Sequence, residues 1–140
     1  WGTGDPDWDA LPDGIPPPES VTTTALISEI GRRSLSQVSF VLPSDTGMIE
    51  LPYGRWNTSV APTRYLYLKT AFDFADAPNA VFREVGVFLD TEVVAGLPIG
   101  QRYFIPAQIA DPGLLLALEY VPAVARAANI RQTFEFVLEI

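Results

Sequence analysis

The sequence contains no histidine and no cysteine, and each absence removes a class of chemistry. Without histidine there is no Ser-His-Asp triad, no imidazole general base and no imidazole metal ligand. Without cysteine there are no disulfides and no thiolate zinc sites, so packing and hydrogen bonds alone must hold the fold. We therefore predict neither a cofactor nor a metal site.

Positive charge and long hydrophobic runs are also scarce. The 140 residues include nine Lys and Arg against 17 Asp and Glu, a formal net charge of −8. A surface this acidic is poorly suited to phosphates, so we do not expect a nucleic-acid partner. The longest apolar run, residues 114–118, is far shorter than the roughly 20 residues of a membrane-spanning helix. Hydrophobic side chains make up 48% of the chain, which is enough to bury the core of one domain.

The first twenty residues differ in composition from the rest of the chain. They carry acidic side chains but no Lys or Arg, and they end near three consecutive prolines, which favour an extended polyproline conformation. We predict an extended acidic Pro-rich arm at residues 1–20 and a β-sandwich domain at residues 21–140. Removal of residues 1–18 should then leave the melting of the domain nearly unchanged. The residues of the arm expected to bind a partner are Trp1, Trp8, Leu11, Ile15, Pro16, Pro17 and Pro18.

The aspartates of this arm also suggest a calcium loop. Asp5, Asp7 and Asp9 alternate as carboxylates do at the start of such a loop, where they converge on a hard cation. The pattern then fails, because Ala10 and Pro16 occupy the positions of the turn glycine and the bidentate glutamate. The carboxylates of the arm are therefore expected to be solvated.

Residues 22–31 are the only segment that predicts a helix. Leu26, Ile27 and Ile30 have helical spacing, the preceding threonines can cap the helix, and Gly31 can end it. The β-branched threonines at 22–24 fit a strand as well, so that alternative stays open.

From residue 37 onward the pattern predicts strands. The clearest is 64–74, in which alternation predicts one buried face made of Leu66, Leu68, Thr70, Phe72 and Phe74. Residues 114–121 are nearly all apolar and predict a central strand covered on both faces. Further strands are predicted at 38–42, 48–53, 82–89, 101–105 and 133–140.

These strands are short and are separated by turns rich in Pro and Gly. The pattern predicts a mainly β protein, an antiparallel β-sandwich or barrel with one short N-terminal helix and the extended arm. One buried cluster is expected to hold Phe72, Phe74, Phe88, Phe134 and Phe136.

A pair of carboxylates is the remaining route to catalysis, as in glycoside hydrolysis. The candidates lie at strand ends and in turns, where carboxylates are usually solvated, and nothing in the sequence fixes a separation between any two of them. We therefore predict that the protein is not an enzyme. The candidates are Asp73, Asp76, Glu84, Asp90 and Glu92.

The aromatic residues provide two competing interpretations. Tyr65 and Tyr67 lie opposite the apolar face of strand 64–74, and together with Trp56 they are candidates for a protein interface. With Tyr53 and Tyr103, the same rings could instead form a platform for sugars. A carbohydrate- or receptor-binding β-sandwich is therefore the alternative function.

Residues 82–88, Phe-Arg-Glu-Val-Gly-Val-Phe, resemble a strand in the base-proximal domains of tailed-phage tail fibres and related baseplate proteins. Residues 62–67, 72–74, 108–113 and 134–137, together with Trp56, are similar to small tail and baseplate proteins of contractile phages. The resemblance covers about residues 25–140.

This resemblance implies a baseplate or tail-fibre adaptor without catalytic activity, located in the virion tail. Its implied partners are other tail and baseplate proteins, and it would be a homo-oligomer within the assembly. Such a component would be assembled in the host cytoplasm.

Overall fold

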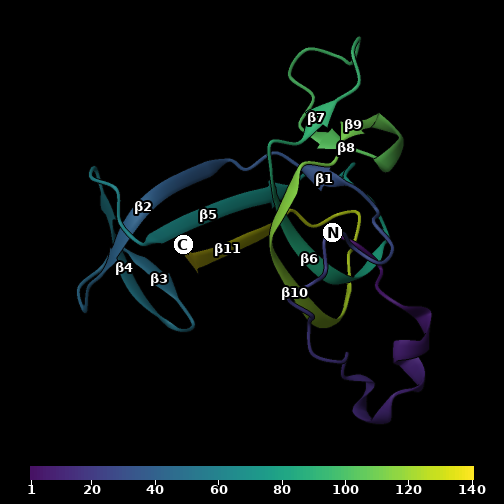
Figure 1. Ribbon diagram of the computed structural model, residues 1–140, viewed down its shortest axis with the longest axis horizontal. Coiled ribbons are helices and arrows are strands. Elements are labelled where there is room, and N and C mark those ends of the chain that lie inside the picture. The colour runs from purple at the N-terminus through teal and green to yellow at the C-terminus, as the bar shows by residue number, and fades with distance from the viewer. The chain divides into compact units, whose positions relative to one another are not determined.

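The computed structural model describes residues 1–140, with the exception of the Asp13 side chain. Antiparallel strands dominate this described chain, and its helical elements are short 3-10 helices (Figure 1). The prediction of a mainly β, antiparallel fold is confirmed. In chain order the elements are η1 (Pro6–Ala10), η2 (Pro12–Gly14), β1 (Arg32–Arg33), β2 (Gln37–Pro43), β3 (Ile49–Leu51), β4 (Gly54–Ser59), β5 (Tyr65–Phe72), β6 (Val81–Leu89), β7 (Glu92–Val93), β8 (Tyr103–Phe104), η3 (Pro106–Gln108), β9 (Ile109–Asp111), β10 (Leu114–Ala125) and β11 (Gln132–Glu139).

The chain packs as two compact units. Unit 1 comprises Trp1–Arg33 and Phe74–Ile130, and unit 2 comprises Ser34–Asp73 and Arg131–Ile140. Unit 1 contains three two-stranded sheets, β1–β8, β10–β6 and β7–β9. The predicted boundary between arm and domain after residue 20 remains a prediction. In the structure, the first 33 residues pack within unit 1.

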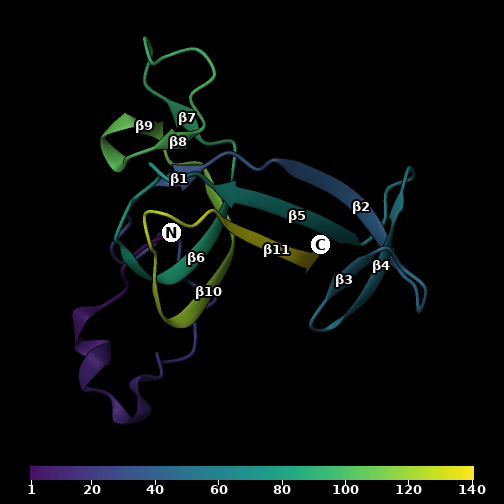
Figure 2. The ribbon, with the colours of Figure 1, turned by 180° about the vertical axis from the view of Figure 1, so that it is seen from behind.

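Unit 2 is built on one five-stranded antiparallel sheet in the order β11-β5-β2-β4-β3. β2, β5 and β11 run side by side in both views (Figures 1 and 2). The core of this unit holds Val41, Trp56 and Tyr67. Side chains from both edge strands, Ile49 of β3 and Val137 of β11, pack against that core. The sheet must therefore curl to bring its two edges toward the same cluster.

The curl changes the expected burial of β5. Leu68, Thr70 and Phe72 are buried, as the alternation predicts. Tyr67 points to the opposite face and is also buried, with 3% of its surface exposed. β5 is therefore covered on both faces near its middle, because a curled sheet encloses the face that a flat sheet would leave to solvent.

The predicted single cluster of five phenylalanines is wrong. Phe72 contacts Phe134 in unit 2, with ring centroids 5.6 Å apart. Phe88 lies in unit 1, where the Arg32 guanidinium stands 3.6 Å from its ring centroid. Phe74 is 47% exposed. The chain passes from unit 2 into unit 1 between residues 73 and 74, so residues with one alternating pattern end in different units.

Substitution of these phenylalanines should therefore have unequal effects. We expect Phe72→Ala to lower the free energy of unfolding by about 3–5 kcal/mol, because it opens a cavity beside Phe134. Phe74→Ala should lower it by about 1 kcal/mol or less, since nearly half of that side chain is already in water. Urea unfolding of the two variants checks the difference. Equal losses would contradict the difference in burial between the two side chains.

The predicted helix at residues 22–31 is also wrong: this segment is irregular, apart from one isolated bridge between Glu29 and Gly2. Its backbone N–H groups bind partners outside the segment. Ile27 donates to the Glu84 carboxylate at 2.8 Å, and Ile30 donates to the carbonyl oxygen of Trp1 at 2.8 Å. These distant partners replace the local hydrogen bonds of a helix.

The segment 114–121 is not a central strand. It belongs to β10, which pairs only with β6 in the described chain, and Leu114 is 63% exposed. Pro122 lies within β10 and has no N–H to donate to a second neighbouring strand, a restriction that confines proline mainly to edge strands. The apolar run thus forms one side of a two-stranded ribbon.

Candidate protein-interaction surfaces

The N-terminal segment is packed against its own unit. Trp1 stacks on Tyr103, with ring centroids 5.7 Å apart, and Trp8 contacts Tyr120 at 4.7 Å. Both tryptophans are buried. Gly2 forms isolated bridges to Glu84 on one side and Glu29 on the other, so the first residues lie between two segments of unit 1.

Glu84 organises this arrangement from β6. Its side chain is completely buried, and its carboxylate accepts hydrogen bonds from three backbone N–H groups. The donors are Ile27 at 2.8 Å, Gly4 at 3.1 Å and Ser28 at 3.2 Å. A buried carboxylate is stable when several donors replace its water shell. Glu84 is therefore a structural residue, and the expectation that it is solvated is wrong.

The glycines near the N-terminus make this contact possible. A Cβ atom on Gly2 would lie 2.3 Å from Oε2 of Glu84, and one on Gly4 would lie 2.3 Å from the Trp8 ring. Gly4 also has a positive φ of 68°. Only glycine allows the backbone to approach this closely in that conformation.

The partner contacts predicted for the arm remain a prediction, but the structure narrows where they can occur. Trp1 and Trp8 are covered by their own unit. Leu11 and Ile15 are exposed, as are Pro17 and Pro18, whereas Pro16 is half-buried. The apolar side chains available for a partner therefore lie in residues 11–18.

The aromatic interface candidates do not form an exposed platform. Trp56 and Tyr67 belong to the core of unit 2, and half-buried Tyr65 lies 5.0 Å from the Trp56 ring centroid. Burial raises the pKa of Tyr67 above its ordinary value, with a further contribution from Glu135. Burial likewise raises the pKa of Tyr103, which stacks on Trp1 in unit 1.

The other carboxylates considered for catalysis either form separate ion pairs or are exposed. Asp76 is buried beside Arg33, with which it forms an ion pair, and Asp73 pairs with Arg131. Asp90 and Glu92 are exposed. Within the described residues, no group of three or more acidic side chains is arranged to hold a metal ion.

Charge is divided unequally between the units. Unit 2 has four basic against five acidic residues, a net charge of −1, which leaves −7 of the total −8 in unit 1. Each basic residue of unit 2 pairs with a carboxylate of the same unit. The pairs are Arg55–Glu50, Arg64–Glu139, Lys69–Glu135 and Arg131–Asp73.

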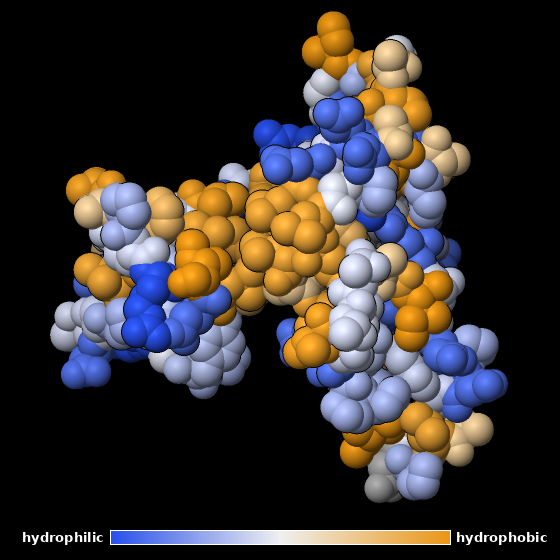
Figure 3. Space-filling model, viewed as in Figure 1, coloured by the Kyte–Doolittle hydropathy of each residue, from blue (hydrophilic) through white to orange (hydrophobic). Residues whose placement is uncertain are grey.

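Unit 2 also carries an apolar row that sequence reasoning did not identify. The strand register places Val38, Leu68 and Phe136 side by side across β2, β5 and β11. Figure 3 shows apolar side chains gathered over this part of the sheet. The apolar alternation of each strand is visible in the sequence. Only the order and register of the strands, however, show that these three residues lie side by side.

These features define a class of protein: mainly β, acidic, and with exposed apolar side chains at several loops. Val21, Met48, Val60 and Ile99 are almost fully exposed. Exposed apolar groups of this kind are typical of surfaces that contact other proteins. No helix in the described part of the chain is long and apolar enough to cross a membrane.

A family model described as "Baseplate wedge 3 tail fiber network component" matches residues 1–140. The chain belongs to this family and is thus a structural component of the phage baseplate, located in the virion tail. The resemblance to tail and baseplate proteins is confirmed, and the match extends through the N-terminal residues. The comparison with curated proteins gives no match.

Proposed function

We propose that this chain is an adaptor that joins tail-fibre and baseplate proteins through protein–protein interfaces, without catalysing a reaction. The observation that carries the proposal is the match of the whole chain to a tail fiber network family. Exposed apolar side chains in both units support it, because a network component needs more than one contact surface. It would be assembled in the host cytoplasm, where a protein without cysteine needs no oxidation to fold.

The partners of this adaptor are other tail proteins and further copies of the chain. Nucleic acid is not a partner in this proposal, since unit 1 carries a net charge of −7 and the basic side chains of unit 2 are paired with carboxylates. The alternative of a carbohydrate- or receptor-binding module has no comparable support. Its proposed rings, Trp56 and Tyr67, lie in a core.

Residues 11–18 are the proposed contact of the arm with a neighbouring tail protein. The prolines limit the entropy that this segment loses on docking, and Leu11 and Ile15 provide the apolar anchors. The double variant Leu11→Ser/Ile15→Ser should melt like the parent, because both side chains are exposed. It should fail to enter tails when it replaces the parent chain in an infected host.

Mass spectrometry of purified tails measures this incorporation. Thr58→Ser is the control, because Thr58 is exposed in unit 2, lies outside the arm and is not one of the exposed apolar side chains. The control should be incorporated normally. Incorporation of the double variant at the parental level would remove the arm from the proposed interface.

A further inference from the structure

The outer edge of β11 is a second candidate interface. Ile140 donates its N–H to the Arg64 carbonyl of the neighbouring chain segment, which continues the β11–β5 ladder. Because N–H directions alternate along a strand, the even-numbered residues of β11 face β5 and the odd-numbered residues face away. Val137 fits this pattern, since its N–H donates to the Tyr53 hydroxyl at 2.9 Å. No strand of the described chain pairs with this outer edge.

This edge lacks the usual protection against strand pairing. Natural edge strands are commonly blocked by proline or by charged side chains, lysine above all. β11 contains neither proline nor lysine, and its two glutamates pair with Lys69 and Arg64 of the same unit. Phe136 and Leu138 are only half-buried on this strand. Each ends an apolar row that crosses from β2 through β5, namely Val38–Leu68–Phe136 and Phe40–Leu66–Leu138. Such an edge favours coverage by another strand.

We propose that the occupant is β11 of a second copy, paired antiparallel across a two-fold axis. This proposal rests on the homo-oligomer within the proposed function and names its contact surface. Two copies of unit 2 meet with little repulsion, because each carries a net charge of only −1. The paired strands make one continuous sheet, and the row of Val38, Leu68 and Phe136 continues into the same row of the second copy.

Charge and strand length together select the register of this pairing. A two-fold axis at Glu135 would place that carboxylate opposite its own copy, and an axis at Val137 would place Glu135 opposite Glu139. Like charges in directly opposed positions destabilise a sheet. An axis at Phe136 instead places Glu135 opposite Val137 and pairs nearly the whole of β11, whereas an axis at Phe134 or Leu138 would pair only part of the strand. Phe136 then faces its own copy in a pair without backbone hydrogen bonds, where side chains approach most closely.

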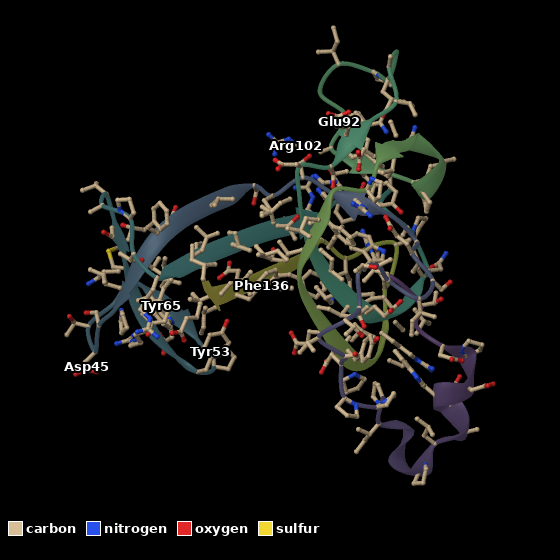
Figure 4. The ribbon with its side chains drawn as sticks, in the orientation of Figure 1. Asp45, Tyr53, Tyr65, Glu92, Arg102 and Phe136 are labelled. Carbon is tan, nitrogen blue, oxygen red and sulfur yellow. The ribbon has the colours of Figure 1, made fainter. Side chains whose placement is uncertain are left out.

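Tyr53 competes with this pairing in the isolated chain. It lies in the turn between β3 and β4, is 59% exposed, and occupies the Val137 N–H that a second copy would need (Figure 4). Tyr53→Phe removes the hydroxyl and should tighten self-association on the order of tenfold, because two such bonds are freed in each dimer. Sedimentation equilibrium measures the change. Tyr103→Phe is the control, because its hydroxyl bonds to Ile30 in unit 1.

The absence of native cysteine allows a sharper test of the register. In the full chain, Phe136→Cys should form a disulfide-linked dimer under mild oxidation. Opposed residues in such a pair have Cα atoms roughly 4.5 Å apart, within the range of a disulfide. Leu138→Cys should not be linked, because the two copies of residue 138 would lie about 13 Å apart along the strands. Equal linking of both variants, or linking of residue 138 alone, overturns the proposal.

Hydrogen exchange on the unsubstituted chain provides the second measurement. The N–H groups of Thr133, Glu135 and Glu139 should exchange more slowly as protein concentration rises. Exchange that does not change with concentration, together with no disulfide in the Phe136→Cys variant, also overturns the proposal. If that variant enters tails and forms no disulfide when the purified tails are mildly oxidised, the adaptor function stands and the β11 contact falls.

Discussion

Deletion of residues 1–18 is expected to destabilise unit 1 severely and to leave most of the protein insoluble. The deletion removes Trp1 and Trp8, both buried, and the backbone of Gly2 that bridges β6. Truncation of one buried tryptophan to alanine typically costs about 3–5 kcal/mol, and a whole domain is stable by only about 5–15 kcal/mol. Thermal melting followed by circular dichroism measures the loss.

The double variant Leu11→Ser/Ile15→Ser separates folding from binding in this experiment. It retains both tryptophans and changes only exposed side chains, so it should melt like the parent. A truncated chain that also melts like the parent would show that the N-terminal segment does not contribute to the stability of unit 1. The composition of the arm predicts unchanged melting of the truncated chain, whereas the contacts of its two tryptophans predict a severe loss of stability.

The N-terminal segment shows why composition was insufficient. Its acidic and proline-rich residues predict a solvated arm, and the described side chains of residues 11–18 are mostly exposed in agreement with that expectation. Its tryptophans, however, pack against Tyr103 and Tyr120, about a hundred residues further along the chain. A segment whose partners are so distant in sequence leaves no local pattern from which its burial could be predicted.

The strands were predictable where their alternation is local. β5, β6 and β11 lie at the expected positions, because each has a period of two in its apolar side chains. β4 was missed, since Gly54, Asn57 and Ser59 give it little strand propensity. It forms because β2 and β3 provide hydrogen-bonding partners on both of its edges.

The faces of the strands were harder to predict than their positions. Alternation in β5 separates Tyr67 from Leu68 but does not show whether the sheet is flat or curled. The curl of unit 2 brings Val137 and Ile49 to one cluster and buries Tyr67 with them. An expected interface residue thus became a core residue, and the apolar row ending at Phe136 emerged only from the strand order.

The helix at residues 22–31 failed for a related reason, which leads to the last prediction. Ile27 and Ser28 donate their N–H groups to the Glu84 carboxylate, more than fifty residues away. Gly4 donates to the same carboxylate. One side chain therefore holds two separate segments against β6, and its substitution should loosen both.

Glu84→Gln is expected to lower the free energy of unfolding by about 3–5 kcal/mol, although the two side chains have nearly the same shape. The glutamine amide keeps one acceptor oxygen and replaces the other with an NH2 group. If the oxygen stays with Ile27, the NH2 group faces the N–H groups of Gly4 and Ser28, so donors meet donors in a site without solvent.

Glu92→Gln is the matched control: Glu92 is exposed opposite Asp111, and loss of its charge should leave stability unchanged or raise it by up to about 1 kcal/mol. Urea unfolding midpoints of the two variants measure this contrast, and equal midpoints would show that the Glu84 carboxylate does not hold the N-terminal segment in place.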